Sequence, residues 1–269
     1  MIQIGIIGCG TIGSAMARAI EQKFSRFASL TYVSEINPAQ IQKLRHKLRS
    51  SQFRVVSIAK LIKRSDLVIE AASVQAASEA IPRALKAGKR ILILSVGGLL
   101  KVKNLKKLTA RSKGYILIPS GGIAGIDAVL AAKAGQIRSV RITTRKPLRS
   151  VQNAPYFLKN GARFRKIKKP TLIFEGNASE AIKNFPENVN VAVTLSLAGI
   201  GPEKTRVRLF ASPTYRYNIH EIELEGKFGR MVSRVMNLPS KENPKTSALA
   251  VGSALATLKK IFSQIKIGT

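Results

Sequence analysis

Short apolar runs alternate with helix-like segments along the first 122 residues. Residues 2–7 are almost continuously apolar and end in the turn GCGTIG, after which Ala15, Met16, Ala19 and Ile20 recur at helical spacing. Further strand-like runs follow, with helical patterns between them, at residues 30–33, 66–71, 91–96 and 115–118. This alternation of strand and helix predicts a parallel, doubly wound α/β sheet.

The pattern changes after about residue 123. Val140, Ile142 and Thr144 alternate with Arg141 and Thr143, and residues 206–209 and 221–225 show the same period of two. Such alternation is typical of an antiparallel sheet with one face in water. Helices are predicted at residues 123–132, at 189–198 after the possible cap Asn188, and at 244–265.

Two domains follow from these patterns. We expect a doubly wound domain over residues 1–122 and an α+β domain over residues 123–243, whose sheet is mixed or antiparallel. The last helix, 244–265, is expected to pack back on the first domain.

The charge of the chain is unusual. Its 269 residues include 46 Lys and Arg but only 14 Asp and Glu, which gives a formal charge of +32. Basic residues cluster at Lys101, Lys103, Lys106 and Lys107, and again at Arg163, Arg165, Lys166, Lys168 and Lys169. Non-specific binding of polyanions is expected, but the basic residues are spread over many segments and no nucleic-acid module with interleaved aromatic residues is recognised, so a solvated basic surface is the favoured interpretation.

Other classes of protein are excluded by composition. The single Cys9 has no partner for an intrachain disulfide, and no stretch reaches the roughly 18 apolar residues of a membrane span. The N-terminus carries no basic segment of the kind that opens a signal peptide. We therefore expect a cytoplasmic protein without a membrane-bound part.

The turn after the first strand predicts a dinucleotide site. Gly8, Gly10 and Gly13 form the pattern G-x-G-x-x-G, in which Thr11 and Ile12 open a helix whose N-terminus favours phosphate. Glu35 ends the second strand, 22 residues after Gly13, and its carboxylate suits the ribose hydroxyls of NAD. The nearby cations Lys43 and Arg45 leave NAD and NADP both open as cofactors. A Rossmann domain is the predicted fold of residues 1–122.

Few residues suit other chemistry. The two histidines lie far apart and no Cys or carboxylate spacing completes a metal site, so no metal is expected. His46 lies among basic residues on a predicted surface helix. His220 shares a strand face with Ile222 and Leu224, so it is either a structural buried histidine or a general acid and base. Cys9 is either an activated thiol at a helix N-terminus or a small residue tolerated in the turn.

The chain resembles the L-aspartate dehydrogenase family over nearly its whole length. The matching stretches are GIIGCGTIG, VIEAAS, SVGG at Ser95, SGGIAGIDA, TTRKP, IFEGNASEA, FPENVNVAVTLSLAG, NIHEI and ENPKTS. The resemblance implies NAD(P)-dependent oxidative deamination of L-aspartate, through iminoaspartate, to oxaloacetate and ammonia. It also implies a homodimer and a link to NAD biosynthesis.

The same resemblance assigns roles to individual residues. It implies that His220 is catalytic and that Ala124 and Asn190 contact the nicotinamide nucleotide. Further cofactor contacts are expected within the matching segments at Ala71, Ala72, Ser73 and Ser95. Arg145, Lys146 and Lys245 are the candidates for binding the substrate carboxylates.

Two alternatives stay open from the residues alone. One is another Rossmann oxidoreductase that acts on a different amino or hydroxy acid. The other is a non-catalytic basic scaffold that binds a cofactor or nucleic acid.

Overall fold

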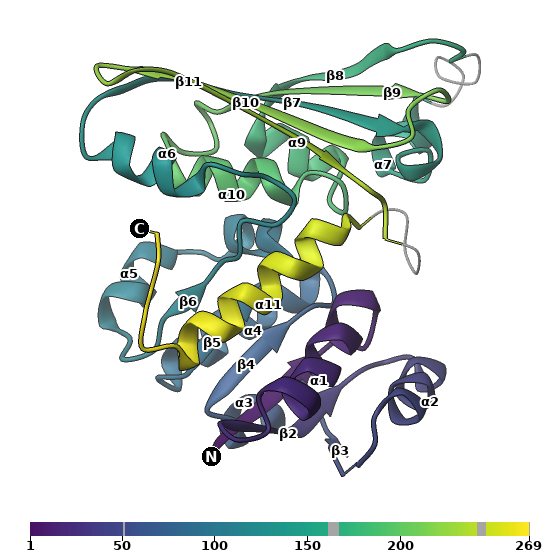
Figure 1. Cartoon of the computed structure of the whole chain (residues 1–269), viewed down its shortest axis with the longest axis vertical. Helices are drawn as coiled ribbons and strands as arrows, with labels where there is room; N and C mark the ends of the chain where they lie inside the picture. The colour runs from purple at the N-terminus through teal and green to yellow at the C-terminus, as the bar shows by residue number, and fades with distance from the viewer. Residues whose placement is uncertain (51, 161–166, 241–245, 269) are drawn as a thin grey trace. The chain divides into compact units, whose positions relative to one another are not determined.

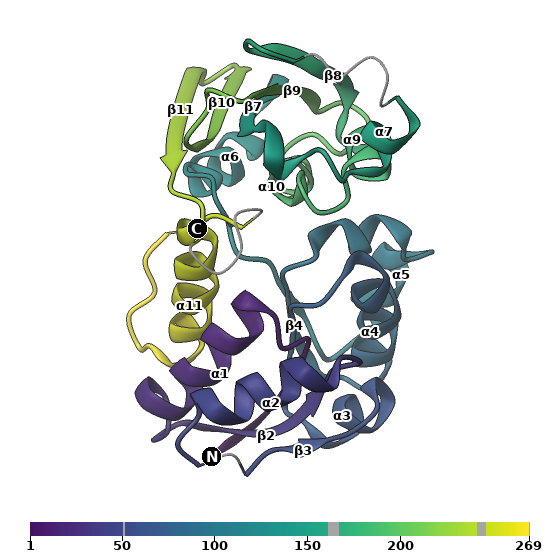
Figure 2. The ribbon, with the colours of Figure 1, turned by 90° about the vertical axis from the view of Figure 1, so that its right-hand side faces the viewer.

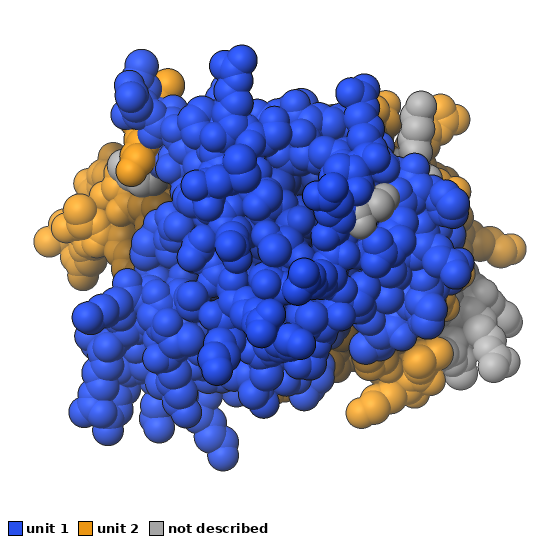
Figure 3. Space-filling view, turned by 90° about the horizontal axis from the view of Figure 1, so that it is seen from below, with its two compact units in different colours: residues 1–119, 254–265 blue, residues 120–253, 266–269 orange. Residues whose placement is uncertain are grey.

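The computed structural model describes residues 1–50, 52–160, 167–240 and 246–268. The chain divides into two compact units, which Figure 3 shows in different colours. The first unit comprises residues 1–119 and 254–265, and the second comprises residues 120–253 and 266–269. Helix α11 (Ala248–Phe262) therefore contributes residues to both units.

The first unit is built on a parallel six-stranded sheet. Its strands are β1 (Ile2–Ile7), β2 (Ala28–Ser34), β3 (Arg54–Val55), β4 (Leu67–Glu70), β5 (Arg90–Ile93) and β6 (Ile116–Leu117). Their order is β3-β2-β1-β4-β5-β6, and every neighbouring pair is parallel. This confirms the predicted doubly wound α/β fold.

Helices cover both faces of that sheet. The elements between the strands are α1 (Thr11–Lys23), α2 (Pro38–Lys47), α3 (Ile58–Arg64), α4 (Val74–Lys86), the 3₁₀ helix η1 (Val96–Lys101) and α5 (Leu105–Arg111). Figure 2 shows α1 and α11 on one face and α3 and α4 on the other. Helix α2 begins as predicted, because the side chain of Asn37 accepts a hydrogen bond from the amide of Ala39 and Pro38 opens the first turn.

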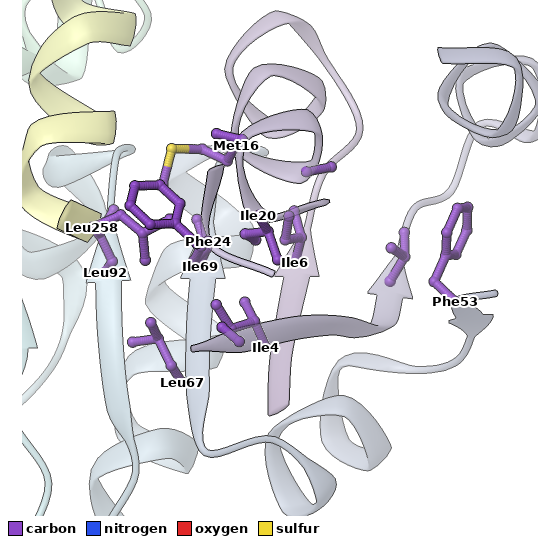
Figure 4. Packing of buried hydrophobic residues seen from close by; sticks show 14 of the residues in the cluster. Ile4, Ile6, Met16, Ile20, Phe24, Phe53, Leu67, Ile69, Leu92 and Leu258 are labelled. Atoms are coloured by element: carbon purple, nitrogen blue, oxygen red, sulfur yellow. The ribbon is translucent and has the colours of Figure 1, made fainter. Parts of the chain in front are cut away.

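The core of the first unit includes part of the last helix. Ile4 and Ile6 of β1 and Ile69 of β4 pack with Met16 of α1 and with Leu258 of α11 (Figure 4). The predicted start of this helix at residue 244 is wrong, because α11 begins at Ala248. Ser247, the residue before the helix, forms an antiparallel bridge with Pro239.

The second unit carries a mixed five-stranded sheet. Its strands are β7 (Ile137–Pro147), β8 (Thr171–Asn177), β9 (Arg206–Ser212), β10 (Asn218–Gly226) and β11 (Gly229–Asn237), in the order β11-β10-β7-β9-β8. The pair β7 and β9 is parallel and the other pairs are antiparallel. A purely antiparallel sheet is therefore excluded, and the alternation of side chains could not show this because it is the same in both directions.

Helices cover one face of the mixed sheet (Figure 1). They are α6 (Ile126–Lys133), the 3₁₀ helix η2 (Leu148–Ser150), α7 (Pro155–Lys159), α9 (Ala178–Asn184) and α10 (Asn190–Ala198). Helix α6 starts three residues later than predicted, because Gly125 has a φ of +88° that no helix interior adopts. No helix in the described parts of the chain is long and apolar enough to cross a bilayer.

Candidate active site

The glycine turn has the geometry that a dinucleotide needs. Gly8 has a φ of +94°, and a Cβ added there would lie 2.8 Å from the backbone of Ala71 and Ala72. A Cβ added at Gly13 would overlap the carbonyl oxygen of Gly8, whereas one added at Gly10 would meet no atom within 4 Å. The turn thus packs tightly at its two ends and is open at Gly10, where a pyrophosphate approaches in this motif. Thr11 and Ile12 form the first residues of α1, as predicted.

Glu35 lies directly beside this turn. One carboxylate oxygen accepts a hydrogen bond of 2.7 Å from the amide of Cys9, and the other accepts bonds from the amides of Ile36 and Asn37. The side chain is partly exposed. It links the end of β2 to the glycine turn, at the position where a ribose carboxylate partner is expected.

Cys9 is not an activated thiol. Its side chain is buried, and burial, with the negative charge of Glu35, raises the pKa of the thiol to about 12. A protonated thiol is a poor nucleophile. Cys9 therefore fits the second interpretation, a small residue that fills space within the turn.

The loops after β4 and β5 are joined by Glu70, a residue that no sequence pattern marks as functional. The fully buried carboxylate of Glu70 accepts hydrogen bonds from the amides of Ala72, Ser73 and Ser95 and from the hydroxyl of Ser95. Ala71 donates its amide to the carbonyl of Ile7 in β1. Three of the predicted cofactor contacts, Ala72, Ser73 and Ser95, are thus brought together around one side chain, and the fourth, Ala71, is held by β1.

His220 lies in the second unit, in the middle of the mixed sheet. It is 3% exposed, and Nδ1 lies 3.0 Å from the hydroxyl oxygen of Thr144, the residue paired with it on β7. Burial and the charge of Lys146 lower the pKa of His220 to about 3. The imidazole is therefore neutral at pH 7, with a ring nitrogen that has a free lone pair.

Lys146 is a buried cation on the same face as His220. Thr144 and Lys146 are two residues apart on β7, so both side chains point to one side of the sheet. Burial lowers the pKa of Lys146 to about 8, and Nζ lies 3.4 Å from Oδ1 of Asn188. Asn188 was predicted to cap α10, but Val189 occupies that position and Asn188 contacts the lysine instead.

The segment from Gly121 to Gly125 is fixed by side chains around it. Asn237 donates to the carbonyl of Gly122 at 2.8 Å, and Ser233 donates to the carbonyl of Ala124 at 3.1 Å. A Cβ added at Gly121 would lie 3.4 Å from Val191, so the segment runs beside the start of α10. Asn190 is the first residue of that helix and is partly exposed, and Ala124 is exposed.

The other predicted site residues are not brought to His220. Arg145 precedes Lys146 on β7 and points to the opposite face, where its guanidinium lies 3.8 Å from Glu221. His46 is exposed on α2, as predicted. Lys245 lies outside the described residues.

Asn218 is a further buried polar residue near this site. It lies two residues before His220 on the same face of β10 and is fully buried. Neither polar atom of its side chain has a hydrogen-bond partner among the residues that the structure describes. The alternation of β10 places it beside His220, but its lack of partners could be seen only in three dimensions.

Fold and site together define a Rossmann-type NAD(P)-dependent dehydrogenase. The parallel sheet, the glycine turn that is open at Gly10 and the carboxylate of Glu35 fit the dinucleotide, and the neutral His220 fits acid and base chemistry. Comparison with known proteins narrows this class.

Two family models and several relatives match the chain. The model described as aspartate dehydrogenase, C-terminal, matches residues 127–261, and the model of the NAD binding domain of homoserine dehydrogenase matches residues 8–119. The L-aspartate dehydrogenases of Methanosarcina barkeri and Methanosarcina mazei are 46% and 45% identical to the chain, over 100% of both sequences. The crystal structure of aspartate dehydrogenase from Thermotoga maritima matches with a TM-score of 0.75 at 25% identity, over 100% of both chains. The chain belongs to the aspartate dehydrogenase family.

Proposed function

We propose that this chain oxidises L-aspartate with NAD or NADP to iminoaspartate, which is hydrolysed to oxaloacetate and ammonia. The observation that carries this proposal is the pair His220 and Lys146 on one sheet face. A neutral imidazole and a buried ammonium are the groups that imine hydrolysis and carboxylate binding require.

The first unit binds the cofactor. When bound, NAD or NADP accepts a hydride from the α-carbon of the substrate. The amides at the start of α1 bind the pyrophosphate beside Gly10, and the carboxylate of Glu35 binds the ribose. Ala124 and Asn190 of the second unit contact the nicotinamide nucleotide.

His220 moves protons during hydrolysis of the imine. In the tautomer that carries its hydrogen on Nδ1, the ring donates to the hydroxyl oxygen of Thr144, and the lone pair of Nε2 then accepts a proton from the attacking water. The new C–O bond turns the protonated imine into a neutral carbinolamine. The imidazolium then returns the proton to the nitrogen, the C–N bond breaks and ammonia leaves, while the hydroxyl group gives its proton to Nε2 as the carbonyl of oxaloacetate forms.

Lys146 binds a carboxylate of the substrate. A pKa of about 8 leaves the amine mostly charged at pH 7, and a carboxylate beside it would favour the charged form further. Arg145 is not part of this proposal because it points to the other face and pairs with Glu221. Of the three basic residues that the resemblance offered for this role, Lys146 is the described one that fits it, and Lys245 lies outside the described residues.

A substrate panel tests this function. The purified chain is given NAD or NADP with L-aspartate, L-glutamate, L-alanine or L-malate at moderate salt, and the reduced cofactor is followed by absorbance. Selective turnover of L-aspartate is expected. Turnover of another compound alone would identify that compound as the substrate in place of aspartate. Cofactor binding without any turnover would favour the non-catalytic scaffold.

We further propose a cytoplasmic homodimer linked to NAD biosynthesis, which uses iminoaspartate. The face of the mixed sheet that lacks helices in the described residues exposes Val232 and Met236 of β11, and these apolar side chains support its use as a subunit contact. Light scattering at several protein concentrations tests the dimer. A monomer at all concentrations would contradict it.

Non-specific binding of polyanions is a separate proposal. Five basic residues line one surface depression of the first unit, namely Lys86, Lys101, Lys103, Lys107 and Arg111. Part of the second predicted cluster, Arg163 to Lys166, lies outside the described residues. Binding to heparin or DNA should weaken steeply as salt rises, and affinity that does not depend on salt would contradict the proposal.

A further inference from the structure

Glu70 is a buried carboxylate that the proposed reaction does not use directly. It is the last residue of β4 and is 0% exposed. Its two oxygens accept hydrogen bonds from the amides of Ala72 at 2.9 Å, Ser73 at 3.1 Å and Ser95 at 3.0 Å, and from the hydroxyl of Ser95 at 2.9 Å. The side chain therefore satisfies three backbone donors at the end of the sheet.

These donors need a group that only accepts hydrogen bonds. Burial raises the pKa of Glu70, while the hydrogen bonds from Ser95, Ala72 and Ser73 oppose that rise. Glu70 forms no ion pair with any residue that the structure describes. The carboxylate is thus compensated by oriented N–H and O–H groups, which remain fixed only while it is present.

The groups that Glu70 holds lie at the ligand-binding edge of the sheet. Ser73 is the cap of α4, and Ser95 follows β5, so one side chain joins the loops after two neighbouring strands. The loop at Ala71 and Ala72 also packs against Gly8 of the glycine turn. In a doubly wound sheet the carboxyl ends of the strands bind the ligand, and the two halves of the sheet bind the two nucleotides of the cofactor.

We propose that Glu70 is a positioning residue for the nicotinamide nucleotide of the cofactor. Strands β4, β5 and β6 form the half of the sheet beyond β1, whereas Glu35 and β2 belong to the half that binds the adenosine part. Glu70 holds the loops after β4 and β5 in one arrangement, so that their backbone meets the second nucleotide without further ordering. This inference rests on the cofactor binding of the proposed function, and not on the identity of the substrate.

The test compares binding of the whole cofactor with binding of its adenosine half. Glu70→Gln replaces one acceptor oxygen by an NH₂ group, which must face either the amide of Ser95 or the amides of Ala72 and Ser73. We expect the Kd of NADH, measured by titration calorimetry without aspartate, to rise about tenfold, because a buried donor is left without a partner. The Kd of AMP should stay within about twofold of the wild-type value.

Asp66→Asn is the matched control. Asp66 precedes β4 at its other end and accepts a hydrogen bond from the amide of Gln3 at 2.8 Å. The variant changes the net charge by the same amount and also removes a carboxylate that binds a backbone amide. Its affinities for NADH and AMP should match those of the wild type, which separates the effect of Glu70 from that of charge.

Each outcome decides the inference. An unchanged Kd of NADH in Glu70→Gln overturns it, and so does an equal loss of NADH and AMP affinity, which would indicate a general loss of structure. If Glu70→Gln does not fold, Ser95→Ala removes one of the four hydrogen bonds and should weaken NADH relative to AMP by a smaller factor. An unchanged ratio in that variant overturns the inference. A chain that binds NADH in this way but does not oxidise aspartate would contradict the proposed function alone.

Discussion

The imidazole of His220 and the hydroxyl of Thr144 lie 3.0 Å apart because β10 pairs with β7 in a register that sets these two residues opposite each other. The orientation of the ring is thus determined by the sheet. Two rigid strands position the contact, and both side chains point to the face that carries Lys146.

Thr144→Val should lower kcat about tenfold and leave the Kd of NADH unchanged. Valine has the shape of threonine but no hydroxyl group to form a hydrogen bond with Nδ1, so the ring loses the contact that orients it. Thr143→Val is the control, since Thr143 is also buried but lies on the opposite face of β7. Steady-state kinetics and NADH titration check both variants, and equal losses in the two would contradict a role through His220.

His220→Gln should lower turnover by about a hundredfold or more, while NADH still binds. A variant with turnover near that of the wild type would exclude the proposed role.

The same variant should change the response to acid. The folded-state pKa of His220 is about 3 and its ordinary value is 6.5, so between these pH values the unfolded chain binds a proton that the folded chain does not. The wild type should therefore lose about 1.4 kcal/mol of stability per pH unit through this residue as pH falls across that window. Urea unfolding at pH 6.5 and 4.5 should show a smaller loss for His220→Gln, and equal losses would contradict the burial of a neutral imidazole.

Lys146→Met should abolish aspartate turnover but stabilise the fold. The folded-state pKa of about 8 lies below the usual 10.5, so the buried charge costs stability as pH falls from 10.5 to 8, and the whole cost is present below pH 8. Removing the charge should raise the free energy of unfolding at pH 7 by on the order of 2–3 kcal/mol. The gain should shrink between pH 8 and 10.5. Lys183→Met, at an exposed position on α9, is the control and should change neither quantity.

Glu35→Ala should weaken the binding of NAD more than the binding of NADP. The carboxylate binds ribose hydroxyls and repels a 2′-phosphate, so its loss removes an attraction in one case and a repulsion in the other. The substitution also removes the hydrogen bond from the amide of Cys9 to Glu35, which should weaken the binding of both cofactors. Glu21→Ala is matched, because Glu21 also accepts two backbone amides in the first unit, from Arg49 and Ser50. Titration of both variants with NAD and NADP checks this, and an unchanged ratio for Glu35→Ala would exclude a ribose contact.

The order of elements and the faces of the strands could be predicted from the sequence. The spacing of apolar residues gave the doubly wound domain, and period-two alternation placed His220 on the buried side of β10. Strands β8 and β11 were not predicted. The run of β8 mixes apolar residues with Glu175 and Gly176, and β11 lies at the edge of the sheet with its side chains largely in contact with water.

The polar contacts of the site could be predicted only in part. Arg145 and Lys146 both lie in a family-like segment, but adjacent residues on a strand face opposite ways, so one site can use only one of them. Asn188 is of a residue type that often caps helices, but its side chain contacts Lys146 instead. The two residues are 42 positions apart in the sequence, so local patterns could not predict this contact. In the sequence, Glu70 is simply one residue of a predicted buried strand. Only the structure shows the four hydrogen-bond donors around its carboxylate.

The division of α11 between the two units has a consequence for synthesis on the ribosome. The ring centroid of Phe262 lies 5.6 Å from that of Phe24 and 5.5 Å from that of Phe27. The side chain that packs on these N-terminal aromatic residues therefore comes from the C-terminal helix. The N-terminal unit is translated first but is completed only when residues 254–265 have been made. A nascent chain that ends before Ala254 leaves apolar residues of its N-terminal unit uncovered. A truncation at this point would therefore destabilise the N-terminal unit, although it removes only C-terminal residues.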